Sequence, residues 1–143
     1  MSENRIVVNA DGIILGRLCS YVAKKALLGY SVDIVNIEKC IITGTPKIIF
    51  AKFKRFLNMG EPFHGPFIGS SAKDLFKRSL RRMVPHKKAR GVEALARVKA
   101  YKGLPARYKD QSMEILQDMH VSKVPNTKYV RLEEVTRFLG GKE

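Results

Sequence analysis

The first quarter of the chain alternates strand-like and helix-like hydrophobic patterns. Residues 5–9 form a short β-rich run, and residues 10–12 supply a turn. After this turn, apolar residues recur at steps of three and four until Gly29, a favourable stop. This spacing predicts a helix whose buried face is Leu15, Leu18, Cys19, Val22, Ala23, Ala26 and Leu27. Residues 31–37 are β-branched and almost continuously apolar, as is typical of a strand covered on both faces. Together the three segments predict a βαβ unit with parallel strands and a right-handed crossover.

The middle of the chain continues this alternation. Residues 40–43 predict another short strand, and residues 47–57 predict a helix that buries Ile48, Ile49, Phe53, Phe56 and Leu57. Residues 58–71 are rich in glycine and proline and predict a loop. We expect a helix from about residue 72 to residue 82, with an apolar side made of Leu75, Phe76, Leu80 and Met83. Because proline disfavours helical geometry in the residue before it, Pro85 should turn the chain near Val84.

The last third of the chain carries weaker patterns until its end. Residues 91–98 predict a short helix and residues 99–101 a strand, whereas residues 110–126 are only weakly periodic. A terminal helix over about residues 131–139 has two acids in its first turn and would pack through Leu132, Val135, Phe138 and Leu139. Strands alternating with helices predict one compact three-layer α/β domain over residues 1–143. Its small, largely parallel central sheet should be flanked by helices and accompanied by basic loops.

Composition and charge narrow the class of partner. The 143 residues carry a net charge of +14, and 45% of them are hydrophobic, so the chain can build an ordinary core. So large a positive charge indicates a polyanionic binding partner. Nucleic acid is the first candidate and an anionic membrane surface the second. No apolar run reaches the roughly 18 residues that span a bilayer, and we expect no signal peptide at the N-terminus. The two cysteines, Cys19 and Cys40, lack metal-site spacing and are expected to be buried in a reducing cytoplasm.

The positive charge is concentrated in one segment. Residues 73–109 contain 13 Lys and Arg against 2 acids, which is most of the excess of the whole chain. A solvated basic face without a fixed partner is the alternative, but such a face would spread its charge along the chain. Phosphate binding suits this segment, since each cation that meets a phosphate releases a condensed counterion. The start of the predicted helix at Gly91 adds free N–H groups beside the same segment.

We therefore predict phosphate contacts in and around this segment. The central ones are Arg81, Arg82, Lys87, Lys88 and Arg90. The flanking ones are Arg55, Lys77, Arg78, Lys99, Lys102 and Arg107. His64 and His86 lie in the two loops expected to face RNA, where an imidazole can donate to phosphate or stack on a base. A hydrogen-bonded loop histidine is favoured at least as strongly for each.

Four aromatic residues could also meet RNA. Tyr101 and Tyr108 are interleaved with cations and could stack on bases. A place in the core is favoured for Tyr101, and the two alternatives are balanced for Tyr108. Phe63 and Phe67, in the predicted loop, need cover from the protein itself or from RNA.

Catalytic motifs are missing from the sequence. The turn from Asp11 to Gly16 lacks the glycine spacing of a dinucleotide-binding turn. Residues 44–47 contain a glycine and a lysine, but not at the spacing of a phosphate-binding loop. The three histidines are far apart in sequence and have no nucleophile or carboxylate at a motif spacing. We expect no enzyme activity, no cofactor, no metal site and no small-molecule substrate.

Several segments, in order, resemble the large-subunit ribosomal protein L-thirteen family in its archaeal and eukaryotic form. The opening segments are Asn9-Ala10-Asp11-Gly12, Leu15-Gly16-Arg17-Leu18, Val22-Ala23-Lys24 and Val35-Asn36-Ile37-Glu38-Lys39. The later ones are Gly65-Pro66, Arg81-Arg82-Met83-Val84-Pro85-His86-Lys87, Arg90-Gly91 and Lys99-Ala100-Tyr101-Lys102-Gly103-Leu104-Pro105. Cys19 and Arg82 depart from it, standing where alanine and glycine are usual.

The resemblance implies a three-layer α/β fold without catalysis and a place in the large subunit of the cytoplasmic ribosome. Implied partners are large-subunit ribosomal RNA, bound early in assembly, and neighbouring large-subunit proteins, but no membrane. Two other classes remain open: an RNA-binding regulator outside the ribosome, which would associate with a defined messenger RNA, and a nucleotide-binding enzyme, which would bind a mononucleotide saturably. The missing glycine pattern already argues against the enzyme. A membrane-surface role would need an exposed apolar face beside the basic one, but the apolar residues of the basic helix are expected to lie in the core.

Overall fold

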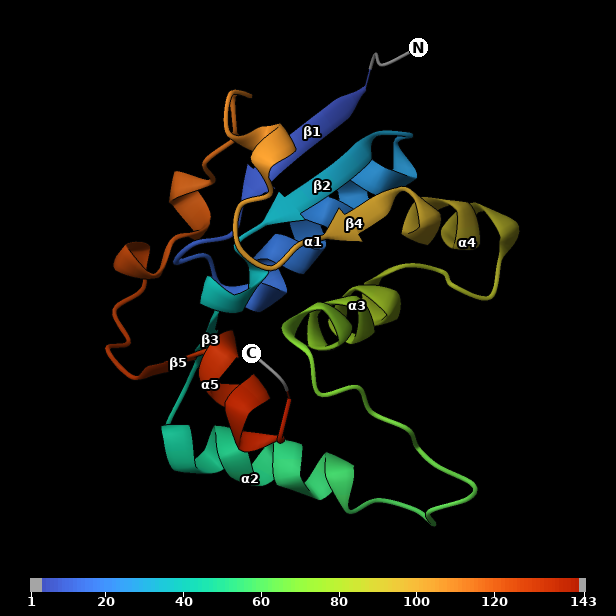
Figure 1. Ribbon diagram of the computed structural model, residues 1–143, viewed down its shortest axis with the longest axis vertical. Coiled ribbons are helices and arrows are strands. Elements are labelled where there is room, and N and C mark those ends of the chain that lie inside the picture. Colours follow the sequence, from blue (N-terminus) through green and yellow to red (C-terminus); the bar gives the residue numbers. More distant parts are fainter. Residues whose placement is uncertain (1–3, 142–143) are drawn as a thin grey trace.

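The computed structural model describes residues 4–141 (Figure 1). Within these residues, five strands and five α-helices follow one another in an α/β order. Their bounds are β1 Arg5–Asn9, α1 Leu15–Leu27, β2 Ser31–Val35, β3 Ile41–Thr43, α2 Pro46–Leu57, α3 Ala72–Met83, α4 Ala89–Ala96, β4 Val98–Ala100, β5 Tyr129–Arg131 and α5 Leu132–Phe138. The α/β fold class is confirmed.

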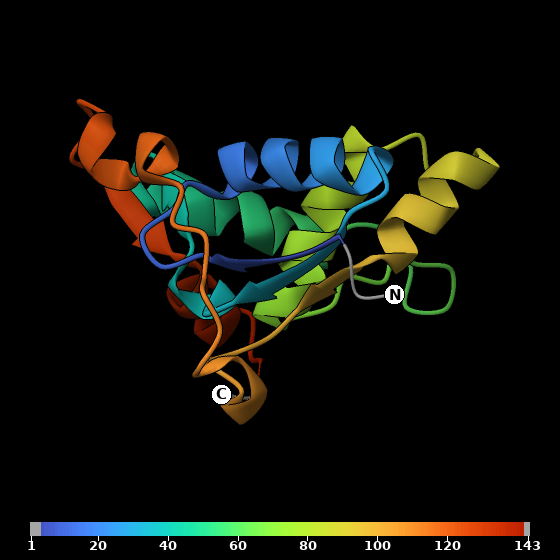
Figure 2. The same cartoon turned by 90° about the horizontal axis from the view of Figure 1, so that it is seen from above.

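The main sheet has three parallel strands in the order β1-β2-β4. The β1–α1–β2 segment is the predicted βαβ unit, and Val8 pairs with Ile34 in its register. Because β2 is central, both of its faces are covered: Val32 and Ile34 pack in the core that contains α1, while Val35 packs beside Tyr108. Figure 2 shows α1 lying along one face of the strands. The opposite face is covered by residues 101–113, which include a short 3-10 turn, Ala106–Tyr108, and no α-helix of the described chain covers it.

The predicted strand at residues 40–43 exists as β3 but does not join this sheet. It pairs antiparallel with β5, a strand that the sequence pattern did not reveal, to form a separate two-stranded sheet. The chain passes from β2 to β3 through a 3-10 turn, Ile37–Lys39, which begins after Asn36 in the left-handed conformation (φ 56°). The small sheet and α5 lie beside the main sheet and share its core, since Val130, Leu132 and Val135 belong to the same buried cluster (Figure 1).

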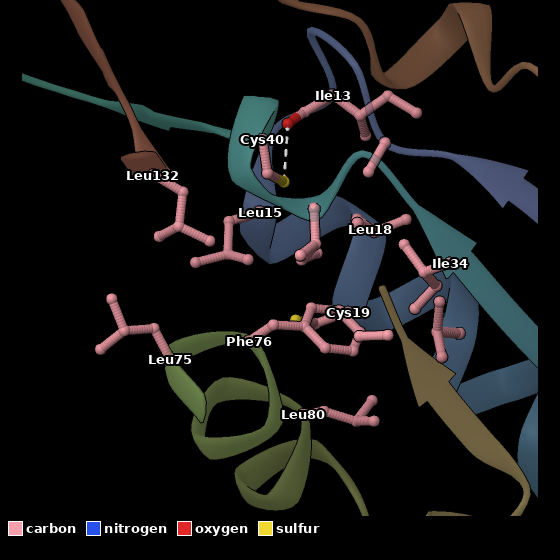
Figure 3. Close-up of a cluster of buried hydrophobic side chains, with 14 of the residues drawn as sticks. Ile13, Leu15, Leu18, Cys19, Ile34, Cys40, Leu75, Phe76, Leu80 and Leu132 are labelled. Atoms are coloured by element: carbon pink, nitrogen blue, oxygen red, sulfur yellow. Dashed lines mark hydrogen bonds between the residues drawn. The ribbon is translucent and has the colours of Figure 1, made fainter. Parts of the chain in front are cut away.

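The main core lies between α1, α3 and the sheet, as Figure 3 shows. Leu18 and Cys19 of α1 share this core with Phe76 and Leu80 of α3, with Cys19 beside Phe76, and all four are at most 1% exposed. Burial raises the pKa of both cysteine thiols to about 12, and the Cys40 Sγ donates to the carbonyl oxygen of Ile13 at 3.1 Å. Both cysteines are free and buried, as predicted.

Local signals account for both ends of α3. Ser71 caps its N-terminus by accepting a hydrogen bond from the backbone N–H of Asp74 at 3.1 Å. The helix ends at Met83 because Val84 is extended ahead of Pro85, which confirms the predicted turn. The predicted short helix is found two residues earlier, as α4, and Val98 belongs to β4.

Some side chains predicted to be buried are exposed instead. On α2 only Ile49 is fully buried, and Phe50, which the prediction omitted, packs at a tilt against Phe138 of α5 with 4.9 Å between ring centroids. A hydrophobic pattern overstates burial when a helix touches the body along a narrow line. The exposed residues from the predicted apolar faces are Ile48, Leu57, Met83 and Phe138.

Candidate nucleic-acid interface

The end of α3, residues 84–88 and the start of α4 form a corner of the molecule that we call the basic corner. Lys77 and Arg81 lie one turn apart on α3, opposite its buried residues Phe76 and Leu80. Because the apolar face of α3 is held in the core, its cations are directed away from it. The exposed cations of the corner are Lys77, Arg81, Arg82, Lys87, Lys88 and Arg90, and Arg78 beside them is half-buried.

The loop of the basic corner is held by its own backbone. The Pro85 carbonyl accepts a hydrogen bond from the Lys88 N–H at 3.0 Å, and Lys88 is the N-cap of α4. Gly91 lies so close to Pro85 that a Cβ at this position would overlap the Pro85 carbonyl oxygen. The close approach explains why glycine is needed here, which the sequence pattern alone did not indicate.

His86 is a structural part of this corner. Its Nδ1 lies 3.1 Å from the carbonyl oxygen of Arg81, one of the free carbonyls at the C-terminal end of α3. The ring is therefore in contact with the helix end, as the hydrogen-bonded alternative requires, and a contact between His86 and RNA stays a prediction.

The cations of the basic corner have no acidic partners among the described residues. Among residues 4–141, Arg5 pairs with Asp33, Arg97 with Glu93 and Arg131 with Glu133, while His64 lies near Glu61; none of these contacts involves a cation of the basic corner. Arg78 instead lies 5.3 Å from the ring centroid of Phe56 on α2. The first turn of α4 contains no acid and no side-chain cap, so nothing there neutralises the positive end of the helix. The corner is thus a surface of uncompensated positive charge.

Lys99, Lys102 and Arg107 form a second group, separate from the basic corner. The chain after β4 crosses the sheet face opposite α1, while the α3–α4 connection lies on another side (Figures 1 and 2). Lys102 lines a hollow of about 540 Å³ whose wall includes both Glu38 and Glu133. One contiguous stretch of sequence therefore supplies two distinct surfaces, and the second contains acids as well as cations.

The structure places both tyrosines against one small buried cluster: Tyr108, for which core and surface were balanced, is fully buried, and Tyr101, expected in the core, is half-buried beside it. Tyr108 is 1% exposed and donates a hydrogen bond to the Asp33 carboxylate at 2.5 Å, whereas Tyr101 is half-buried. Burial, reinforced by this hydrogen bond, raises the pKa of Tyr108 above its usual range. The Arg107 guanidinium lies over both rings, 4.7 Å from Tyr101 and 4.6 Å from Tyr108. Stacking of Tyr108 on an exposed base is therefore excluded.

The loop between α2 and α3 carries His64 and two phenylalanines, and Arg55 lies on α2 just before it. His64 is exposed at the loop tip, with its Nε2 3.8 Å from a Glu61 carboxylate oxygen, and Arg55 is exposed on α2. Phe63 and Phe67 are 90% and 76% exposed, so the protein itself does not provide the cover they were expected to need. This loop adds an exposed aromatic surface beside α3.

Residues 4–141 contain no cluster of acids, histidines and cysteines able to hold a metal ion. In the same residues, no helix is long and apolar enough to cross a membrane. Together, fold and surface define a small basic α/β protein whose uncompensated cations gather on a helix–loop–helix corner.

Comparison with known proteins identifies the family within this class. The family model for Ribosomal protein L13 matches residues 3–107, and the chain belongs to this family. It is 38% identical to the large ribosomal subunit protein uL13 of Methanococcoides burtonii over 136 residues, covering 95% of this chain and 98% of that protein. The protein of the same name from Archaeoglobus fulgidus is 37% identical over 141 residues, covering 98% of this chain and 90% of that protein. The protein of this name from Methanococcus maripaludis is 39% identical over 142 residues, covering 96% of this chain and 98% of that protein.

Family membership confirms the resemblance seen in the sequence motifs, and these relatives are of the archaeal type. It makes the chain a structural ribosomal protein and not an enzyme, with the cytoplasmic location of the ribosome.

Proposed function

We propose that this protein is a structural component of the large ribosomal subunit that binds ribosomal RNA through the basic corner. The observation that supports this most is the set of exposed cations on α3, its following loop and α4 that lack acidic partners among the described residues. Such cations repel one another in the free protein and gain most when phosphates approach. Binding by shape and charge, without base readout, suits a corner that presents a fixed array of cations.

The proposed role in assembly follows from the same charge. RNA segments that converge in a subunit repel one another through their phosphates, and a cationic corner between them lowers that repulsion. The basic corner would act where such segments meet, with Arg81, Arg82, Lys87, Lys88 and Arg90 at its centre. The second group, Lys99, Lys102 and Arg107, together with Arg55, would contact RNA or neighbouring large-subunit proteins at the periphery.

A salt titration of binding to large-subunit ribosomal RNA tests this proposal. The variant carries Arg81→Gln, Lys87→Gln and Arg90→Gln, all at exposed positions. Each lost phosphate contact should reduce the slope of log K against log salt by about 0.7–0.9 units. The control is Lys123→Gln, since Lys123 is exposed in a short 3-10 turn, Val121–Lys123, away from the corner. An unchanged slope in the triple variant would remove the basic corner as the RNA-binding surface.

Sedimentation of a cell extract tests the ribosomal placement independently. At low salt and again at about 0.5 M salt, the protein is followed through the gradient by mass spectrometry. Nonspecific phosphate binding weakens by orders of magnitude over such a range. Retention with the large subunit at high salt is the expected result for an integral component. Release into the soluble fraction would favour an RNA-binding regulator outside the ribosome.

A further inference from the structure

The loop between α2 and α3 creates two hollows that share the side chain of Phe67. One, of about 430 Å³, is lined by Lys77, Arg78 and Arg81 of α3. The other, of about 410 Å³, is largely apolar and is lined by Leu57, Met59, Pro62 and Pro66. Phe67 and Ile68 belong to the walls of both. An exposed aromatic ring thus lies between a cationic hollow and an apolar one.

The acids beside these hollows already have partners. In the cationic hollow, a carboxylate oxygen of Asp74 accepts a hydrogen bond from the Ser71 hydroxyl at 2.7 Å. In the apolar hollow, the Glu61 carboxylate lies 3.8 Å from His64. Neither acid forms an ion pair with Lys77, Arg78 or Arg81 within residues 4–141. The cationic hollow therefore carries three cations against the single carboxylate of Asp74, and its net charge favours an anion.

The backbone holds the loop in a defined shape. The Glu61 carbonyl accepts hydrogen bonds from the N–H groups of His64 and Gly65 at 3.2 and 3.0 Å. A Cβ on Gly60 would overlap the Gly65 carbonyl, so the two sides of the turn touch. The Phe67 ring lies against Gly65, where a Cβ would come within 3.2 Å of two ring carbons. A partner would meet this ring without first having to order the turn that supports it.

We propose that the Phe67 ring is a stacking platform for one unpaired base of the RNA. The phosphates on either side of that base would be bound by Lys77, Arg78 and Arg81. A nucleotide matches this arrangement because it joins an apolar, planar face to an anion, as the Phe67 ring adjoins the cationic hollow. A paired base in a helix has no free face to offer, so the site selects looped-out or single-stranded RNA. The proposal rests on the proposed function and names the kind of RNA that this part of the surface takes.

Binding of two RNA probes tests it. One is an unpaired oligoadenylate of about ten nucleotides, and the other is a duplex with the same number of phosphates. Phe67→Leu keeps the apolar volume but removes the aromatic face. It should raise the Kd for the oligoadenylate about tenfold and leave the Kd for the duplex and the salt slope of both unchanged. The matched control is Phe63→Leu, since Phe63 is the more exposed ring and lines neither hollow.

Each other outcome has a defined meaning. Equal weakening of both probes, or no weakening of either, overturns the base platform while leaving the phosphate-binding function intact. If wild-type protein binds neither probe nor ribosomal RNA, the proposed function itself fails. If Phe67→Leu binds both probes normally but is retained less in large subunits, the platform holds a neighbouring protein and the proposal is overturned.

Discussion

At the scale of single residues, a glycine shapes the basic corner. Gly91 is buried in the first turn of α4, where its backbone lies against the Pro85 carbonyl. The loop that carries Lys87 and Lys88 is therefore held at a fixed distance from the helix that carries Arg90. The positions of these three cations depend on a residue that has no charge and no side chain.

Gly91→Ala should destabilise the protein. The added methyl group meets backbone atoms that cannot rotate away, and overpacking of this kind costs about 1–3 kcal/mol. Gly16→Ala is the matched control, since Gly16 lies in α1 with nothing within 4 Å of a Cβ, and alanine there should be neutral or stabilising. Urea denaturation of both variants measures the effect. Equal stability of the Gly91 variant and wild type would show that the loop moves freely.

Residue-scale contacts also decided which tyrosine is available. Tyr108 and Asp33 are 75 positions apart in the chain, and their hydrogen bond forms only when residues 101–113 fold over the sheet. Spacing along the sequence places both tyrosines among cations but contains no information about this contact.

At the scale of elements, α3 connects the core to the charged surface. Its inner face is made of Leu75, Phe76 and Leu80, which are at most 2% exposed, and its outer face carries cations. The apolar spacing of this helix and the turn before Pro85 made it predictable from sequence, and the structure adds the cap at Ser71.

Leu80→Ala should cost about 2–5 kcal/mol of stability, because it leaves a cavity between α3 and the core. Lys77→Ala on the exposed side of the same helix is the control and should change the free energy of unfolding by no more than about 0.5 kcal/mol. Thermal or chemical denaturation distinguishes the two. A loss for Leu80→Ala as small as that for Lys77→Ala would mean that α3 is not anchored as described.

At the scale of the whole molecule, the net charge of +14 opposes folding of the isolated chain. Raising the ionic strength from about 0.01 M to about 0.15 M shortens the Debye length from about 30 Å to about 8 Å. The Tm of the free protein should therefore rise by a few degrees. The Tm of the triple variant with Arg81→Gln, Lys87→Gln and Arg90→Gln should rise less with salt. The Tm of Lys123→Gln should rise nearly as much as that of the wild type. A Tm that falls with added salt would show that attractive ion pairs outweigh this repulsion.

The sequence by itself determined the βαβ unit, the basic helix with its stop, the excess of positive charge and the family. These features depend on periodicity, turn residues and charge among neighbours along the chain, which local patterns record directly. The extents of α1 and β1 agreed with the prediction for the same reason.

Only the tertiary structure decided which distant segments meet. It paired β3 with β5, divided the cations of residues 73–109 between two surfaces, buried Tyr108 and left Phe67 exposed beside α3. Each of these outcomes depends on contacts or on the lack of cover between segments far apart in sequence. Hydrophobic pattern and charge along the chain do not specify such contacts, because one pattern is compatible with several ways of packing the same elements.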